Sequence, residues 1–137
     1  MAVNDSAVTH FTDLKLKHKY RFVIFSLSTD FKEINVESTG EADKDYNEFI
    51  TSLPKNECRY CVYDFEYDVQ DGKRNKILFY VWAPDTSKVK QKMLYAASKD
   101  ALRKKLDGIF TEIQCTDMAE LAYETVLDKV LRMTGAN

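Results

Sequence analysis

The sequence lacks the features that mark several large classes of protein. No apolar run approaches the roughly 18 residues that a membrane-spanning helix needs, and the opening segment MAVNDSAVTH is polar, so we expect neither a membrane span nor a signal peptide. Glycine loops that cradle phosphate, metal-ligand spacings, internal repeats and linkers are also missing. The formal net charge is only -2, so affinity for an anionic partner must come from a local cluster, and nucleic acid is not an expected partner.

Cysteine is scarce, and the pattern of the 3 cysteines argues against a secreted disulfide scaffold. Cys58 and Cys61 form a C-x-x-C pair, but they lie in a strand-like run, where residues three apart point to opposite faces. No second cysteine or histidine pair is near enough to complete a zinc site. We therefore expect buried thiols in a reducing cytoplasm and no bound metal.

Catalytic residues are not indicated either. A cysteine paired with His10 or His18 as base would be the simplest nucleophile, but neither histidine belongs to a recognisable motif. Asp64, Glu66 and Asp68 alternate along one strand and are typical of a solvated or capped edge. We expect no enzyme and no cofactor.

The hydrophobic pattern predicts one α/β domain over residues 1–137, which is long enough to bury a core. Helices interleaved with about five strands imply a mixed sheet covered on both faces. The first half of the chain is expected to form a helix capped by Asn4, Asp5 or Ser6, strands over 20–27 and around 34–36, and a short helix over 46–53. A hairpin of strands 59–67 and 76–82 should follow, about the turn at 70–72. A long helix should start after Pro84, with Asp85, Thr86 or Ser87 as cap, and stop near Gly108; a strand over 110–115 and a final helical segment with Asp117 and Glu120 at its start complete the expected elements.

The long helix is the most informative element, because it combines a basic face with a packing face. At about 100° per residue, the basic residues fall within roughly 60° of one another. They are Lys88, Lys92, Lys99 and Arg103, with Tyr95 beside them. The predicted packing face consists of Met93, Leu94, Ala97 and Ala101. A row of lysines is also what an ordinary solvated helix face presents, so the pattern alone leaves both interpretations open.

This stretch resembles the long helix of the actin-depolymerising factor/cofilin family, which reads W-x-P-D followed by K-M-x-Y-x-S-S-K-D and a basic pair. The matching residues are Trp82, Pro84, Asp85, Lys92, Met93, Tyr95, Ser98, Lys99, Asp100, Arg103 and Lys104. Further blocks at 11–16, 53–67, 72–77, 114–117 and 123–130 stand in family order and at family spacing. The resemblance runs nearly end to end and implies a single ADF-homology domain, with a central mixed five- to six-stranded sheet sandwiched between helices.

The resemblance also implies a function. Family members bind monomeric and filamentous actin, favour the ADP form, and sever or depolymerise filaments without cutting a covalent bond. A monomer acting at the cytoplasmic actin cytoskeleton is expected, with nuclear entry open. Two alternatives remain: a relative that binds actin or an actin-related-protein complex without severing, and a peripheral protein that mainly binds phosphoinositides.

Three sets of site residues follow from the resemblance. The monomer-and-filament site would comprise Ala2, Val3, Lys90, Lys92, Met93, Ser98, Lys99, Asp100, Arg103 and Lys104. The filament-only site would comprise Arg74, Lys76, Asp128, Lys129 and Arg132. Phosphoinositide head groups would contact Lys88, Lys92, Lys99, Arg103 and Lys104.

The N-terminus departs from the family pattern. Relatives carry a serine before a G-x-A-V segment, and its phosphorylation blocks actin binding by placing negative charge against an acidic partner. This chain reads M-A-V, and Ser6 lies further in. We expect either that this regulation is absent or that the start is unusual or truncated.

Overall fold

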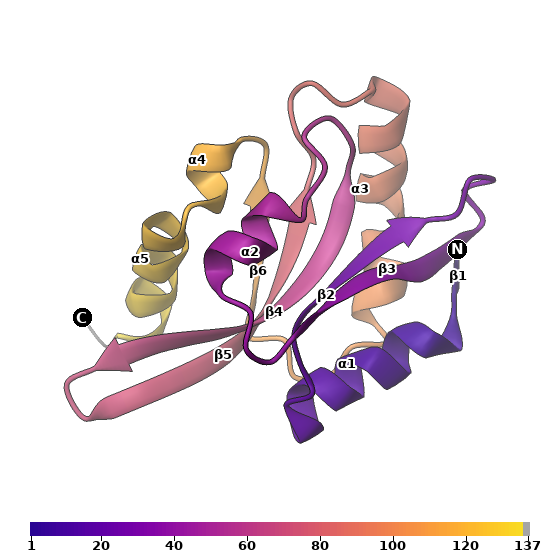
Figure 1. The fold of residues 1–137 in the computed structure, drawn as a ribbon. Helices are drawn as coiled ribbons and strands as arrows, with labels where there is room; N and C mark the ends of the chain where they lie inside the picture. Colours follow the sequence, from indigo (N-terminus) through magenta and orange to yellow (C-terminus); the bar gives the residue numbers. More distant parts are fainter. Residues whose placement is uncertain (136–137) are drawn as a thin grey trace.

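The computed structural model, which describes residues 1–135, has a mixed six-stranded sheet with helices on both faces (Figure 1). The strands lie in the order β1-β3-β2-β4-β5-β6. The four central strands pair antiparallel, while β1 pairs parallel with β3 and β6 parallel with β5. The elements are β1 (Ala2–Val3), α1 (Asp5–Lys17), β2 (Tyr20–Leu27), β3 (Glu33–Glu41), α2 (Tyr46–Thr51), β4 (Arg59–Val69), β5 (Gly72–Trp82), α3 (Val89–Arg103), β6 (Thr111–Cys115), α4 (Met118–Leu121) and α5 (Tyr123–Thr134). The predicted α/β architecture is confirmed.

Alternation along the strands divides the core into two layers. One face of the sheet packs against α1 and α3, and the other packs against α2, α4 and α5 (Figure 1). In β4, Tyr60 belongs to the first layer and Cys61 to the second. Cys58 and Cys61 lie in different layers, as predicted, and the cysteines are free and buried.

Local sequence signals account for several element boundaries. Asn4 caps α1 by accepting a hydrogen bond from the Ser6 N–H at 2.9 Å. The hairpin turns between Val69 and Gly72, and Gly72 has a φ of 128°, a conformation that favours glycine. The predicted final helical segment is in fact two helices, α4 and α5, because Ala122 adopts an extended ψ of 143° between them.

The start of α3 was predicted wrongly. The helix begins at Val89, and its N-cap is Lys88, which makes no side-chain capping bond. Ser87 is buried, and its hydroxyl donates to the Pro84 carbonyl at 2.6 Å, so it closes a turn before the helix instead of capping it. The helix ends at Arg103, and the chain continues in turns before Gly108.

The packing face of α3 was also predicted wrongly. The buried residues are Tyr95, Ser98 and Leu102, while Met93 is 66% exposed and Ala97 is exposed. The reason lies in buried polar groups on the sheet, which need partners. The Tyr95 hydroxyl accepts the Leu27 N–H at 2.9 Å, and the Tyr60 hydroxyl donates to the Tyr95 carbonyl. These contacts turn the tyrosine, and not the methionine, toward the sheet. Among residues 1–135, no helix is long and apolar enough to span a membrane.

Two alanine substitutions test this orientation of α3. Leu102→Ala should lower the free energy of unfolding by about 2–5 kcal/mol, because it leaves a cavity in the core. Met93→Ala should change it by less than about 0.5 kcal/mol, because the side chain is exposed. Urea denaturation of both variants measures the difference. A larger loss from Met93→Ala than from Leu102→Ala would restore the packing face predicted from the sequence.

Candidate functional site

The exposed face of α3 lies beside the N-terminal strand. Pairing of Ala2 with Glu33 and of Val3 with Ile34 holds β1 at the edge of the sheet, where it also contacts α3. The structure therefore brings Ala2 and Val3 next to the helix that carries the other residues of the predicted monomer-and-filament site. These segments are far apart in sequence and meet only through the parallel pairing with β3.

Met93 is the apolar centre of this face. Its side chain is 66% exposed, and Val89, one turn earlier on the helix, is 70% exposed. Lys90, Asp100 and Lys104 are also exposed, and the Lys90 ammonium lies 5.5 Å from the Phe31 ring centroid. An apolar centre surrounded by charges is typical of a surface that binds another protein. We call the exposed side of α3 together with β1 the α3 face.

Ser98 occupies a different position from the other residues of that predicted set. It is only 6% exposed and lies on the packed side of α3. Its side chain therefore helps to seat the helix on the sheet and does not lie on the open face.

The basic residues of α3 are partly neutralised within the molecule. Lys99 Nζ lies 2.8 Å from Glu112 Oε2, and Arg103 Nη1 lies 3.4 Å from Glu112 Oε1. Lys92 Nζ donates to the Asp85 carbonyl at 2.9 Å, while Lys88 is exposed. The four basic residues of the predicted row therefore differ in how far they are free to meet a partner.

Glu112 was not identified from the sequence as a site residue. Burial raises its pKa, but hydrogen bonds from Lys99 and Gln114 and the charges of Lys99 and Arg103 outweigh burial and hold the pKa below its ordinary value. No local motif marks Glu112, because the two cations that pair with it, Lys99 and Arg103, come from another element. Only the register of β6 against β5 places it beside α3.

The second predicted surface involves the β4–β5 hairpin and α5. A hollow of about 440 Å3 lies between the hairpin and the end of α5, and its lining includes Arg74, Lys76 and Thr134. Lys76 Nζ lies 5.0 Å from the Phe110 ring centroid. We call the hairpin and the outer side of α5 the hairpin–α5 face.

On α5 itself, the three predicted residues are exposed and two of them are paired. Arg132 and Asp128 form an ion pair at 2.5 Å along the helix. Lys129 Nζ donates to the Glu112 carbonyl at 3.1 Å, which ties α5 to the edge strand β6.

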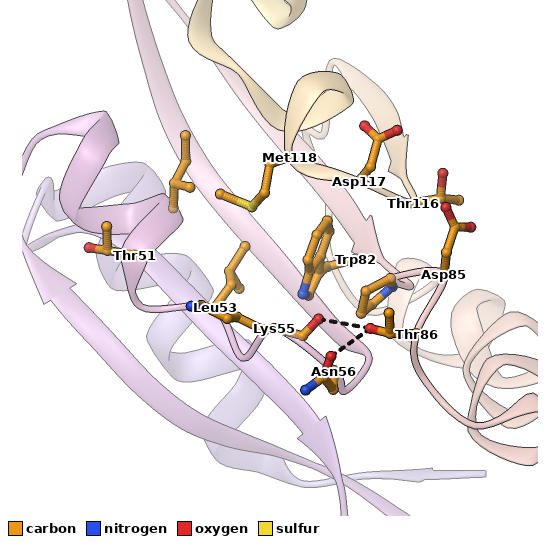
Figure 2. Close-up of a pocket in the computed structure, with 12 residues that line it drawn as sticks. Thr51, Leu53, Lys55, Asn56, Trp82, Asp85, Thr86, Thr116, Asp117 and Met118 are labelled. Carbon is orange, nitrogen blue, oxygen red and sulfur yellow. Dashed lines mark hydrogen bonds between the residues drawn. The ribbon is translucent and has the colours of Figure 1, made fainter.

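An apolar hollow of about 520 Å3 was also missed by sequence reasoning (Figure 2). Trp82, Leu53 and Met118 reach it from three segments, so no local pattern could reveal it. Two hydrogen bonds hold the segments around this hollow together: Trp82 Nε1 donates to the Pro54 carbonyl at 2.7 Å, and the Thr86 hydroxyl donates to Asn56 Oδ1 at 2.6 Å. The residues of the predicted sites lie outside its lining.

Two of the cysteines and one of the histidines that the sequence offers as nucleophile or base have identifiable local environments. Burial raises the pKa of the Cys115 thiol to about 12 and the pKa of Cys61 well above its ordinary value, so both thiols remain protonated. His10 Nδ1 lies 2.7 Å from the Ser6 carbonyl of its own helix. Among residues 1–135, no group of three or more metal-ligating side chains comes together.

Comparison with known proteins gives a consistent result. The family described as "Cofilin/tropomyosin-type actin-binding protein" matches residues 1–131. A cofilin of Ogataea parapolymorpha is 56% identical over 98% of this chain and 95% of its own length. The cofilin of Saccharomyces cerevisiae is 47% identical over 100% of this chain and 96% of its own length. The crystal structure of Streptomyces griseoflavus cofilin superimposes with a TM-score of 0.90 at 50% identity, covering 96% of this chain and 97% of that one.

The Glu112 cluster makes a prediction about pH. Because the pKa of Glu112 is lower in the folded protein than its ordinary value of 4.5, its ionised form stabilises the fold above that value, and this contribution is lost as the pH falls through the folded pKa. Glu112→Gln should therefore be less stable than the wild type near neutral pH, and the difference should shrink under acid. Urea denaturation of both proteins between about pH 7 and pH 3 measures it. A difference that does not change with pH would contradict the ionised cluster.

Proposed function

The chain belongs to the cofilin/tropomyosin-type actin-binding protein family, and from this premise we propose that it binds monomeric and filamentous actin and depolymerises and severs filaments. The observation that carries the proposal is the α3 face, where an exposed Met93 lies among charges beside the N-terminal strand. A flexible, polarisable methionine suits an apolar cleft on a partner. The surrounding lysines suit carboxylates at its rim.

We assign monomer and filament binding to the α3 face. Met93 would provide the buried anchor of the interface, with Lys90, Lys92 and Lys104 making charged contacts around it. Lys99, Asp100 and Arg103 would line the same face, and Ser98 would contribute by seating the helix. Ala2 and Val3 would extend the interface along β1. A site used for both forms of actin must contact a single subunit.

We assign the filament-only contacts to the hairpin–α5 face. Arg74 and Lys76 on β5 and Asp128, Lys129 and Arg132 on α5 would reach the second subunit of a filament. The helices of the two faces, α3 and α5, pack on opposite faces of one sheet, so one molecule could contact two subunits at once. This arrangement explains why loss of the second face would leave the monomer site intact.

The mechanism is differential binding, and no covalent bond is broken. A ligand shifts a filament from one subunit arrangement to another only by as much as it prefers the second arrangement. Preference for ADP-actin would direct the protein to older parts of filaments, and the junctions between decorated and bare stretches would be the weak points where severing occurs. The protein would act as a monomer at the actin cytoskeleton.

Anionic lipid head groups would compete for the α3 face. Lys88 and Lys104 are exposed, so they are available to phosphoinositide phosphates. Lys92, Lys99 and Arg103 would contribute less, since each already contacts an acceptor within the molecule. Lipid binding would then inhibit actin binding instead of defining a separate function.

Removing the apolar anchor and one exposed charge tests the α3 face. Met93→Ala combined with Lys104→Ala should weaken both monomer and filament binding by about tenfold or more, because a hot-spot side chain and its charged neighbour are lost. Monomer affinity can be measured by fluorescence titration and filament binding by co-sedimentation. The matched control is Leu16→Ala with Lys17→Ala, which removes an equally exposed apolar side chain and a lysine from α1. Equal behaviour of the two double variants would refute the assignment.

The hairpin–α5 face is tested separately. Arg74→Ala combined with Lys76→Ala should reduce filament co-sedimentation and severing, while monomer affinity should stay within about twofold, since exposed charges outside an interface contribute little. Severing can be followed by the lengths of single filaments under the microscope. A loss of monomer affinity as large as the loss of filament binding would mean that the two faces are not separate sites.

A further inference from the structure

Glu112 is an acidic side chain placed inside a basic surface. It is the second residue of β6, and its side chain is 24% exposed. Each carboxylate oxygen serves one cation: Oε2 lies 2.8 Å from Lys99 Nζ and Oε1 lies 3.4 Å from Arg103 Nη1. The Gln114 amide donates to Oε2 at 2.9 Å and fixes the orientation of the carboxylate. Both cations belong to α3, where their side chains are 26% and 32% exposed.

Arg103 is held from two sides. Its guanidinium lies 5.5 Å from the centroid of the Phe79 ring, and its Nη1 contacts Glu112. Phe79 and Glu112 are register partners on β5 and β6, so both contacts come from adjacent positions of the sheet. The Arg103 Nε is buried and has no hydrogen-bond partner within residues 1–135, which leaves the Glu112 carboxylate as the main polar restraint on this side chain.

The main chain of Glu112 makes a further contact, with helix α5. Because β6 is an edge strand, some of its carbonyls lack a partner in the sheet. The Glu112 carbonyl accepts a hydrogen bond from Lys129 Nζ of α5 at 3.1 Å. One residue therefore contacts both α3 and α5.

We propose that Glu112 is a positioning residue for actin binding: it holds Lys99 and Arg103 in the arrangement that an actin subunit meets. This inference rests on the proposed function, since it names a residue that prepares the same face. Glu112 itself does not need to touch actin. Its contribution is to order two long side chains before the partner arrives, so that less conformational freedom is lost on binding.

Removing the carboxylate has two opposite effects on the affinity for actin. The sign of the net change in affinity therefore separates the positioning role from a simple charge effect. Glu112→Gln removes one negative charge next to α3, which by electrostatics alone should increase affinity for any acidic partner. It also frees Lys99 and Arg103, which must then be ordered during binding. A shaped protein surface is sensitive to that ordering, whereas a fluid anionic membrane adapts to mobile cations.

The experiment compares wild type and Glu112→Gln on two probes. Affinity for monomeric ADP-actin should fall by about three- to tenfold, the factor expected when one or two long side chains must be immobilised on binding. Binding to vesicles of phosphatidylserine in phosphatidylcholine should instead increase, because the freed cations reach the lipid. The gain on vesicles should disappear at high salt, but the loss on actin should remain.

Glu41→Gln is the matched control, since it makes the same charge change at an exposed position of β3. It should leave the affinity for actin unchanged. Glu112→Asp restores the charge and should recover part of the actin affinity, and circular dichroism establishes that each variant is folded. Thermal melting then separates a stability loss from the binding effect.

The affinities of the wild type and of Glu112→Gln for actin and for vesicles decide whether Glu112 has the positioning role. Tighter binding of Glu112→Gln to both actin and vesicles would identify Glu112 as an electrostatic brake and overturn the positioning role. Unchanged affinity for actin would also overturn it. Wild-type protein that fails to bind actin would refute the proposed function itself, whereas wild-type binding with an unaffected variant would refute only the role of Glu112.

Discussion

The buried hydrogen bonds between α3 and the sheet decide which side chains the molecule presents to a partner. The Tyr95 hydroxyl accepts the Leu27 N–H, and the Tyr60 hydroxyl donates to the Tyr95 carbonyl. Burial raises the pKa of both hydroxyls, so Tyr60 keeps the proton that it donates to the Tyr95 carbonyl. An unpaired polar group at this depth would be costly, so the rotation of α3 about its own axis is fixed. Met93 is exposed as a consequence of where Tyr95 lies.

Much of the fold was predictable because its signals are local. The apolar run over β2, the turn before Gly72 and the cap at Asn4 each depend on residues close together in sequence. The orientation of α3 was not predictable in this way. Helical periodicity treats Tyr95 as half polar and Met93 as apolar, but the structure reverses their burial, since only tyrosine can satisfy a distant backbone donor.

In the candidate site, too, features with a local sequence signal were predictable and features that depend on distant segments were not. Motif matching along α3 named exposed residues such as Met93 and Lys104 together with Ser98, which is buried against the sheet. The pairing of β1 with β3 brings the N-terminus beside the helix. Motif matching along α3 could not identify Glu112, which lies on β6 and neutralises two of the predicted charges of the helix. It also could not identify the hollow beside Trp82, whose walls come from three segments. Contacts made through the sheet have no signature in a single stretch of sequence.

A fixed surface matters more for this function than a strongly charged one. A protein that only adhered to acidic surfaces would bind every state of a filament equally, and a ligand with equal affinity for two states shifts neither. Discrimination between subunit arrangements requires side chains that cannot adapt to both. The net charge of -2 and the internal pairing of Lys99 and Arg103 both limit general attraction. What remains is a face that Tyr95 seats on the sheet. If Glu112 orders its cations as we propose, the rigidity of this face would let binding energy distinguish one filament geometry from another.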